Sequence, residues 1–96
     1  MHKKGRATKI FVLMIYDVGE ERVNKILKIG RKYLNWIQNS VLEGELTPAT
    51  FESLKHEVRK VIKDDHDSVI FYIWRTEHYT SREIMGLEKG SREIFI

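Results

Sequence analysis

FVLMIYD, residues 11–17, is the stretch that decides the fold of this chain. Six apolar or aromatic residues follow one another without a break and end at a single carboxylate, Asp17. An apolar run of this length, rich in β-branched and aromatic residues, is typical of a strand buried on both faces. The acid lies where the strand leaves the sheet, a frequent place for functional groups when helices pack on a sheet. We therefore predict a strand over residues 9–17 with a candidate functional carboxylate at its carboxyl end.

An amphipathic helix is expected after Gly19, where Glu20 and Glu21 suit the positive end of the helix dipole. Its apolar side recurs at helical spacing and consists of Val23, Ile26, Leu27, Gly30 and Leu34. The opposite side carries a basic stripe that consists of Lys25, Lys28 and Lys32. The stripe is either a solvated helix face or a surface for polyanions.

The rest of the chain predicts a second helix and further strands. Residues 36–44 (WIQNSVLEG) indicate a second strand, which can extend into a hairpin. Thr47-Pro48 predicts a helix start, with Thr as N-cap and Pro at the first helical position. Residues 68–74 (SVIFYIW) form a continuous apolar run and are predicted to be a central strand. Two short strands are expected at residues 82–88 and 92–96.

These elements predict an α+β fold, a ferredoxin-like β-α-β-β-α-β sandwich with helices on one face of a mainly antiparallel sheet. We expect a single domain over residues 1–96, in which residues 1–8 form a mobile basic tail. The apolar strand at residues 92–96 would be an unprotected edge unless something pairs with it. A homodimer that exchanges this C-terminal strand would cover the edge.

Composition limits the class of protein. The chain has 96 residues, no cysteine and a net charge of +3. No apolar run approaches the ~18 residues that a membrane helix needs, so we expect a cytoplasmic protein with no membrane partner. Residues 1–35 hold nine Lys and Arg against three Asp and Glu, whereas the remainder holds eight against eleven. A local basic face of this kind attracts DNA or RNA even when the whole chain is only mildly basic.

Asp17 has two readings. It is a turn or helix-capping residue, or it is a metal ligand. One carboxylate is too little for magnesium, which takes six oxygens and usually one or two carboxylates. Two copies of Asp17 that met across a dimer axis could share one ion and support phosphodiester hydrolysis. The acids at residues 64–67 are expected to form a solvated turn, and the four scattered histidines are expected to be surface residues.

The chain resembles the CRISPR-associated protein two family, the small subunit of the spacer-acquisition machinery. The resemblance covers nearly the whole chain and rests on VLMIYDV (12–18), QNSVLEGEL (38–46), TPATFESLK (47–55), D-x-DSVIFYIW (65–74) and REIMGLEKG (82–90). It implies a ferredoxin-like homodimer with crossed C-terminal strands. It also implies endonuclease activity on single-stranded RNA or double-stranded DNA, dependent on Mg²⁺ or another hard divalent ion such as Mn²⁺.

The resemblance also implies roles for particular residues. The acid that ends the first strand binds the metal in this family, which makes Asp17 the expected catalytic metal ligand, with Tyr16 beside it as a second catalytic candidate. Arg22 and Lys25 fall where the family places basic residues, and with Lys28 and Lys32 they form the expected nucleic-acid-binding set. The implied partner is CRISPR-associated protein one, the integrase, which the dimer bridges during spacer acquisition.

Two positions depart from the family pattern, and alternative functions stay open. Trp36 stands where some members have an arginine, and Leu42 replaces a usual aromatic, so cleavage could be weak or differently selective. Trp36 is interpreted as a core residue rather than a stacking platform. The alternatives to a nuclease are a non-catalytic DNA-binding scaffold of the integration complex, a virulence-associated D type toxin ribonuclease, and a small-ligand module on the same fold.

Overall fold

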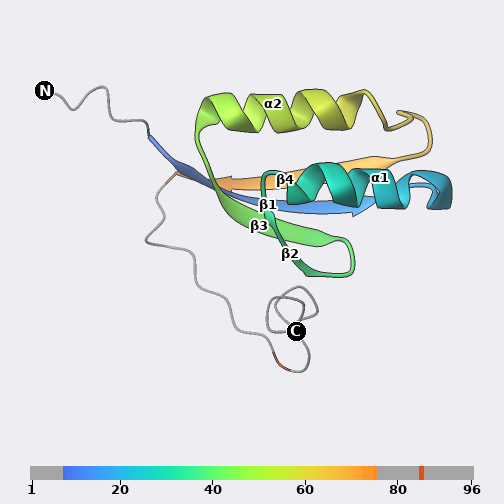
Figure 1. Cartoon of the computed structure of the whole chain (residues 1–96), viewed down its shortest axis with the longest axis horizontal. Coiled ribbons are helices and arrows are strands. Elements are labelled where there is room, and N and C mark those ends of the chain that lie inside the picture. The colour runs from blue at the N-terminus through green and yellow to red at the C-terminus, as the bar shows by residue number, and fades with distance from the viewer. Residues whose placement is uncertain (1–7, 76–84, 86–96) are drawn as a thin grey trace, which may run out of the picture.

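The computed structural model describes residues 8–75 and residue 85. Its elements are β1 (Ile10–Asp17), α1 (Glu20–Arg31), β2 (Asn35–Gln38), β3 (Val41–Leu46), α2 (Pro48–Arg59) and β4 (Ser68–Trp74). The strands form one sheet in the order β2-β3-β1-β4, in which every neighbouring pair is antiparallel. Both helices lie on the same side of this sheet (Figure 1). The predicted ferredoxin-like fold is therefore confirmed. The two strands expected after residue 81, and their exchange in a dimer, lie outside the described residues, as does the tail up to residue 7.

The segment over residues 36–44, predicted as a strand that can extend into a hairpin, is part of a hairpin of two strands, β2 and β3. The turn between them is formed by Asn39 and Ser40, and Asn39 has a φ of 43°. Asparagine tolerates this left-handed conformation better than most side chains. The backbone N–H of Tyr16 donates to the carbonyl of Ser40 at 3.1 Å, which ties the turn to the end of β1.

β1 is buried on one face only, so the prediction of burial on both faces is wrong. Alternate residues point to the helices and are buried, namely Ile10, Val12, Met14 and Tyr16. The residues between them are half-buried on the other face, because neither of the two described helices covers it. The uninterrupted apolar run hid this alternation, which is the normal sign of a one-sided strand.

β4 is an edge strand of the described sheet, although its apolar run predicted a central one. Among the strands that the structure describes, it pairs with β1 alone, from Phe11 opposite Trp74 to Asp17 opposite Ser68. Its apolar residues on the face away from the helices are strongly exposed: Ile70 by 45%, Tyr72 by 50% and Trp74 by 37%. The apolar character of β4 therefore reflects an uncovered surface as well as a core.

Helix boundaries follow the sequence signals. The Thr47 hydroxyl accepts a hydrogen bond from the backbone N–H of Thr50 at 3.1 Å, and Pro48 opens α2 as predicted. The buried side of α2 is formed by Phe51, Leu54 and Val58.

α1 packs closely on β3, as Gly30 shows: a Cβ placed at this glycine would lie 3.1 Å from a methyl of Leu42. Leu42 is fully buried there. Trp36 is half-buried and packs against the same core, so its interpretation as a core residue is confirmed only in part.

Candidate functional site

Asp17 lies at the end of β1 with an exposed side chain. Its register partner is Ser68, the first residue of β4. By the alternation of the strand, Asp17 belongs to the same face as Phe11, Leu13 and Ile15, which is the face away from the helices. No group of three or more His, Cys, Asp or Glu gathers within the described part of the chain. One copy of Asp17 therefore offers a single carboxylate at the rim of an apolar sheet face.

Tyr16 lies on the other face from Asp17. Tyr16 is 3% exposed and packs among the core residues under the helices. Burial raises the pKa of the Tyr16 phenol above its ordinary value, and a hydrogen bond with the Ser40 side chain opposes this in part. The phenol therefore stays protonated at neutral pH. The structure separates the two predicted catalytic side chains, which are adjacent in sequence, to opposite sides of the sheet.

Arg22 is not on the basic surface but in a buried ion pair with Asp67. The Nε of Arg22 donates to one oxygen of Asp67 at 2.6 Å, and Nη2 donates to the other at 2.8 Å. The Asp67 side chain has no exposed area. Its oxygens also accept from the backbone N–H of Gly19 at 2.9 Å and from that of Lys63 at 2.8 Å. Arg22 makes a further bond of 2.8 Å to Glu21.

This ion pair holds together the two turns that flank Asp17. Gly19 belongs to the turn after β1, and the segment from Lys63 to Asp67 leads into β4. The hydrogen bonds from Arg22 hold the pKa of the Asp67 carboxyl well below its usual range, so the carboxylate stays ionised. The expected solvated turn is thus wrong for Asp67, although Asp64 and Asp65 are exposed as predicted.

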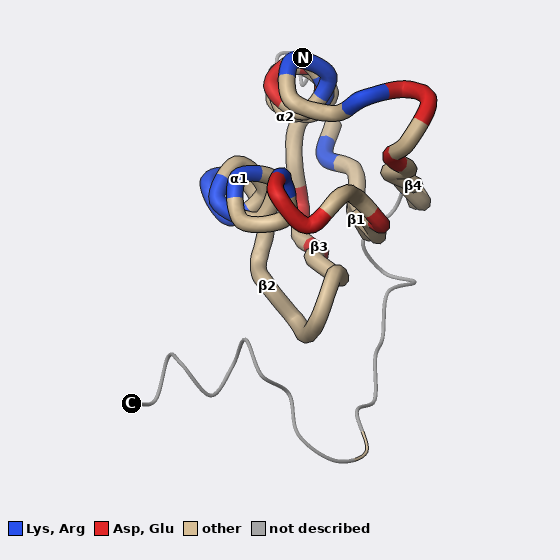
Figure 2. The backbone as a smooth tube through the Cα atoms, turned by 90° about the vertical axis from the view of Figure 1, so that its right-hand side faces the viewer, with Lys and Arg blue, Asp and Glu red and all other residues tan. Residues whose placement is uncertain are grey.

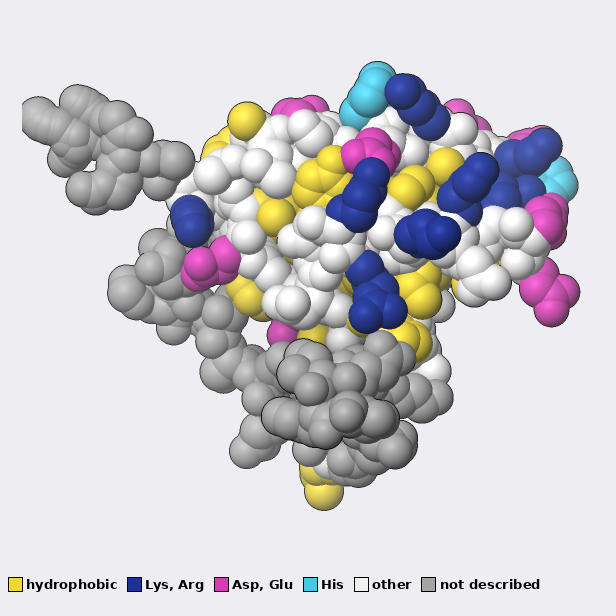
Figure 3. Space-filling model, viewed as in Figure 1, with side chains coloured by type: hydrophobic (Ala, Val, Ile, Leu, Met, Phe, Trp, Pro, Cys, Tyr) yellow, Lys and Arg dark blue, Asp and Glu magenta, His cyan; other side chains and the backbone are white. Residues whose placement is uncertain are grey.

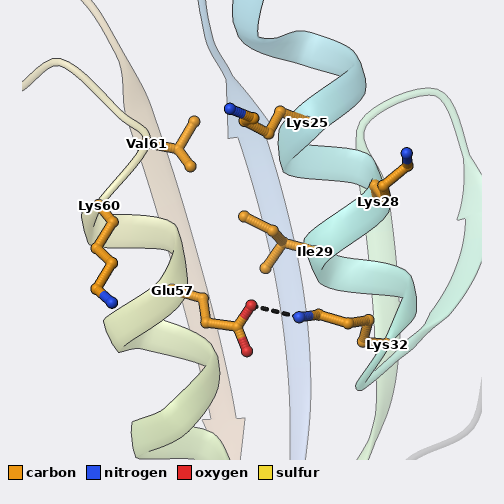
Figure 4. Close-up of a pocket in the computed structure, with 7 residues that line it drawn as sticks. All are labelled: Lys25, Lys28, Ile29, Lys32, Glu57, Lys60 and Val61. Carbon is orange, nitrogen blue, oxygen red and sulfur yellow. Dashed lines mark hydrogen bonds and ion pairs between the residues drawn. The ribbon is translucent and has the colours of Figure 1, made fainter.

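The three stripe lysines, Lys25, Lys28 and Lys32, lie on the exposed side of α1. Figure 2 shows basic positions gathered along this helix, and Figure 3 shows blue side chains clustered over the helix layer. The lysines line a groove between the helices whose other wall includes Glu57 and Lys60 of the α2 end. We call this the lysine groove. Lys32 Nζ pairs with the Glu57 carboxylate at 2.5 Å across it (Figure 4).

The two histidines that the structure describes are surface residues, as predicted. His56 and His66 are exposed, and His66 pairs with the neighbouring Asp65 at 2.9 Å. His2 and His78 lie outside the described residues.

In the described part of the chain, no helix is long and apolar enough to cross a membrane.

Three residues of this region were not foreseen from the sequence: Asp67, Glu57 and Lys60. Asp67 partners a residue 45 positions away and Glu57 one 25 positions away, so no local pattern exposes either contact. A weak signal existed for Lys60, because it follows Glu57 by three residues, one helical turn along α2. Packing the two predicted helices side by side would have placed Lys60 opposite the lysine stripe.

Comparison with known proteins gives a consistent picture. The family model for CRISPR associated protein Cas2 matches residues 10–82. A protein of Dictyoglomus turgidum named CRISPR-associated endoribonuclease Cas2 is 57% identical over 84 residues, covering 88% of this chain and 97% of that protein. The Thermotoga maritima protein of the same name is 54% identical and covers 84% of this chain and 93% of that protein. A crystal structure titled as cas2 superposes with a TM-score of 0.76 at 38% identity, over 84% of this chain and 91% of that one.

Proposed function

Because this chain belongs to the Cas2 family of CRISPR-associated proteins, we propose that it is a metal-dependent endonuclease with Asp17 as the metal ligand. The curated relatives are named endoribonucleases, which supports a nuclease role in CRISPR. Membership of the Cas2 family also favours this assignment over a toxin ribonuclease or a small-ligand module. The proposed substrates are single-stranded RNA and double-stranded DNA.

The observation that carries the proposal is the position of Asp17 at the rim of the uncovered sheet face. A monomer that exposes Ile70, Tyr72 and Trp74 on one face has a contiguous apolar surface of the kind that marks an interface. A second copy that packed on this face would bring its own Asp17 to the same rim. We therefore propose a homodimer that packs through the same surface that carries the acid.

The residues present fit a divalent ion only as a pair of chains. Magnesium takes oxygen ligands and keeps several waters, so two exposed carboxylates, one from each copy, form an adequate protein contribution. A bound Mg²⁺ or Mn²⁺ polarises a phosphate and lowers the pKa of a water ligand. Each chain supplies one Asp17 carboxylate, and its Arg22–Asp67 pair ties the turn after β1 to the segment that leads into β4. Tyr16 is too buried to touch substrate, and we propose that it fixes the end of β1.

A scaffold function is supported by a separate observation. The lysine groove lies in the helix layer, whereas Asp17 belongs to the opposite face of the sheet. A polynucleotide held by Lys25, Lys28 and Lys32 is thus bound away from the proposed metal site. In spacer acquisition this surface would hold DNA while the dimer bridges the CRISPR-associated integrase, protein one. Arg22 is occupied by Asp67, so this surface does not include it.

Cleavage of labelled single-stranded RNA and duplex DNA tests the proposal, with Mg²⁺, with Mn²⁺ and with chelator. Asp17→Asn removes one negative charge at the site, and Asp64→Asn removes one at an exposed turn as the matched control. We expect metal-dependent cutting by the wild type and by Asp64→Asn, and none by Asp17→Asn. Cutting that survives in Asp17→Asn would overturn the catalytic assignment. Absence of cutting by every protein, with duplex binding retained, would leave the scaffold as the function.

A further inference from the structure

The lysine groove contains one carboxylate, Glu57, among four ammonium groups. Lys25 and Lys28 come from α1, and Lys32 and Lys60 are the C-cap residues of α1 and α2. Figure 4 shows Lys25 extending from α1 toward the space between the helices and Lys60 running along the end of α2, with Ile29 and Val61 between the two helices. Within the residues that the structure describes, no ion pair involves Lys25, Lys28 or Lys60. Lys25 and Lys28 are thus available to an anion, while Lys60 attracts the Glu57 carboxylate without forming an ion pair with it.

Lys32 is not available in the same way. Its Nζ lies 2.5 Å from one oxygen of Glu57, and the hydroxyl of Tyr33 donates to the other oxygen. Glu57 is thereby held from two residues that directly follow α1, and its side chain is only 30% exposed. The attraction is mutual: Glu57 raises the pKa of Lys32, and Lys32 and Tyr33 lower the pKa of Glu57. Both side chains therefore remain charged at neutral pH, and the positive charge of Lys32 is balanced by the negative charge of Glu57.

A phosphate backbone would compete with Glu57 for Lys32. Each lysine that contacts a phosphate releases a counterion, which strengthens binding and makes it more dependent on salt. A lysine already paired with a carboxylate contributes less, and the carboxylate itself repels the phosphates. We propose that Glu57 limits the affinity of the lysine groove for a polynucleotide by holding Lys32 against it. This inference rests on the proposed nucleic-acid-binding surface and adds the residue that regulates its strength.

The charge pattern favours a polynucleotide over an acidic peptide as the occupant. The groove offers cations spread along two helices, as needed for the regularly repeated charges of a phosphate backbone. Its polar groups are ammonium donors, which act as point charges on phosphate. Polyglutamate is the appropriate competitor for testing this choice, because it presents repeated negative charge without nucleotides.

The test is a binding series on the intact chain with a fluorescent duplex and a fluorescent single-stranded RNA, measured as a function of salt. The variants are Glu57→Gln, Lys32→Gln and the double variant. Glu52→Gln is the matched control, because Glu52 is an exposed acid of α2 that pairs with Lys55 outside the lysine groove. Thermal melting of each variant establishes that it is folded. Glutamine at position 57 keeps an oxygen that can accept from Tyr33.

For duplex DNA we expect Glu57→Gln to bind about 3- to 10-fold more tightly near 0.1 M salt, with a salt slope steeper by about 0.9. Lys32→Gln is expected to weaken binding, and the double variant to return to nearly the wild-type affinity. The gain from Glu57→Gln should be smaller when Lys32 is already Gln. Glu52→Gln should leave the slope unchanged.

Three outcomes would overturn the inference. If Glu57→Gln behaves like Glu52→Gln, or gains equally in both backgrounds, Glu57 does not act by holding Lys32. If the gain appears with polyglutamate and not with nucleic acid, the occupant is an acidic peptide. If the wild type binds no nucleic acid even at low salt, both the proposed binding surface and the inference are wrong. If the wild type binds nucleic acid and Glu57→Gln does not change the affinity, only the inference is wrong.

Discussion

Arg22 and Asp67 form a two-point ion pair, with Nε and Nη2 of the guanidinium bonded to separate oxygens of one carboxylate at 2.6 and 2.8 Å. Asp67 also accepts from the N–H groups of Gly19 and Lys63. Each oxygen of this buried carboxylate therefore accepts two hydrogen bonds. A buried charge is tolerated when its hydrogen-bonding groups are satisfied in this way. The pair connects two turns that are far apart in sequence, and both lie beside the end of β1.

Asp67→Asn should destabilise the fold. Asparagine keeps the shape of the side chain but leaves the Arg22 charge without its buried partner, and breaking such a pair is costly. We expect the melting temperature to fall by at least about 5 °C. Asp64→Asn, in the same turn but exposed, should melt like the wild type. Equal melting temperatures for both variants would mean that the ion pair does not stabilise the turn.

The same carboxylate should set the acid stability of the protein. The pKa of Asp67 is lower in the folded chain than its ordinary value of 3.8, so its contribution is fully present above that value and is lost as the pH falls below it. Urea unfolding of the wild type should therefore lose stability progressively from about pH 5 downward. Asp67→Asn should show a shallower decline over the same range. Parallel pH profiles would show that other carboxylates, such as Glu57, dominate acid unfolding.

Two isoleucines of β4 allow a test of the proposed dimer. Ile70 lies opposite Ile15 on the face away from the helices, and Ile73 lies opposite Val12 on the helix side. Their exposure is nearly equal, 45% and 44%. We expect Ile70→Lys to give a folded monomer by analytical ultracentrifugation, because it places a charge in the apolar face, and Ile73→Lys to remain dimeric. A dimer in both cases would move the interface elsewhere.

Gly30 should resist substitution, although it lies inside a helix. Alanine in place of glycine ordinarily stabilises an exposed helix position by about 1 kcal/mol. At Gly30 the added methyl would meet two methyls of Leu42 at 3.1 and 3.3 Å, and overpacking of this kind costs about 1–3 kcal/mol. We expect a net loss in urea unfolding for Gly30→Ala, reduced in a Leu42→Val background. Asn24→Ala, on the exposed side of α1, should show no such loss.

The sequence predicted those features that depend on neighbouring residues. The Thr47-Pro48 start of α2, the lysine stripe of α1 and the acid at the end of β1 all follow from local spacing, and the structure has each of them in place. The order of the strands and the face that β1 buries depend on which segments pack together. An unbroken apolar run carries no sign of which residues face the helices, so β1 and β4 were assigned too much burial.

The site was only partly predictable for a related reason. Arg22 is a positively charged residue in a basic helix, which is typical of a nucleic-acid-binding residue. Only its contact with a residue 45 positions away reveals a structural role. Asp67 sits in an acidic turn like its exposed neighbours, and its burial comes from the approach of Gly19 and Arg22. Tyr16 and Asp17 are adjacent in sequence, and the period of the strand sends them to opposite faces.

The central place of β1 in the sheet has a consequence for the order of folding. Met14 pairs with Leu42 on one side and with Phe71 on the other, a partner about twice as far along the chain. Closing the longer loop costs more chain entropy, so the β1–β3 pairing is expected to form first. Until β4 arrives, the second edge of β1 is an open apolar template for other chains. A chain that emerges from the ribosome would carry this hazard until β4 has been synthesised.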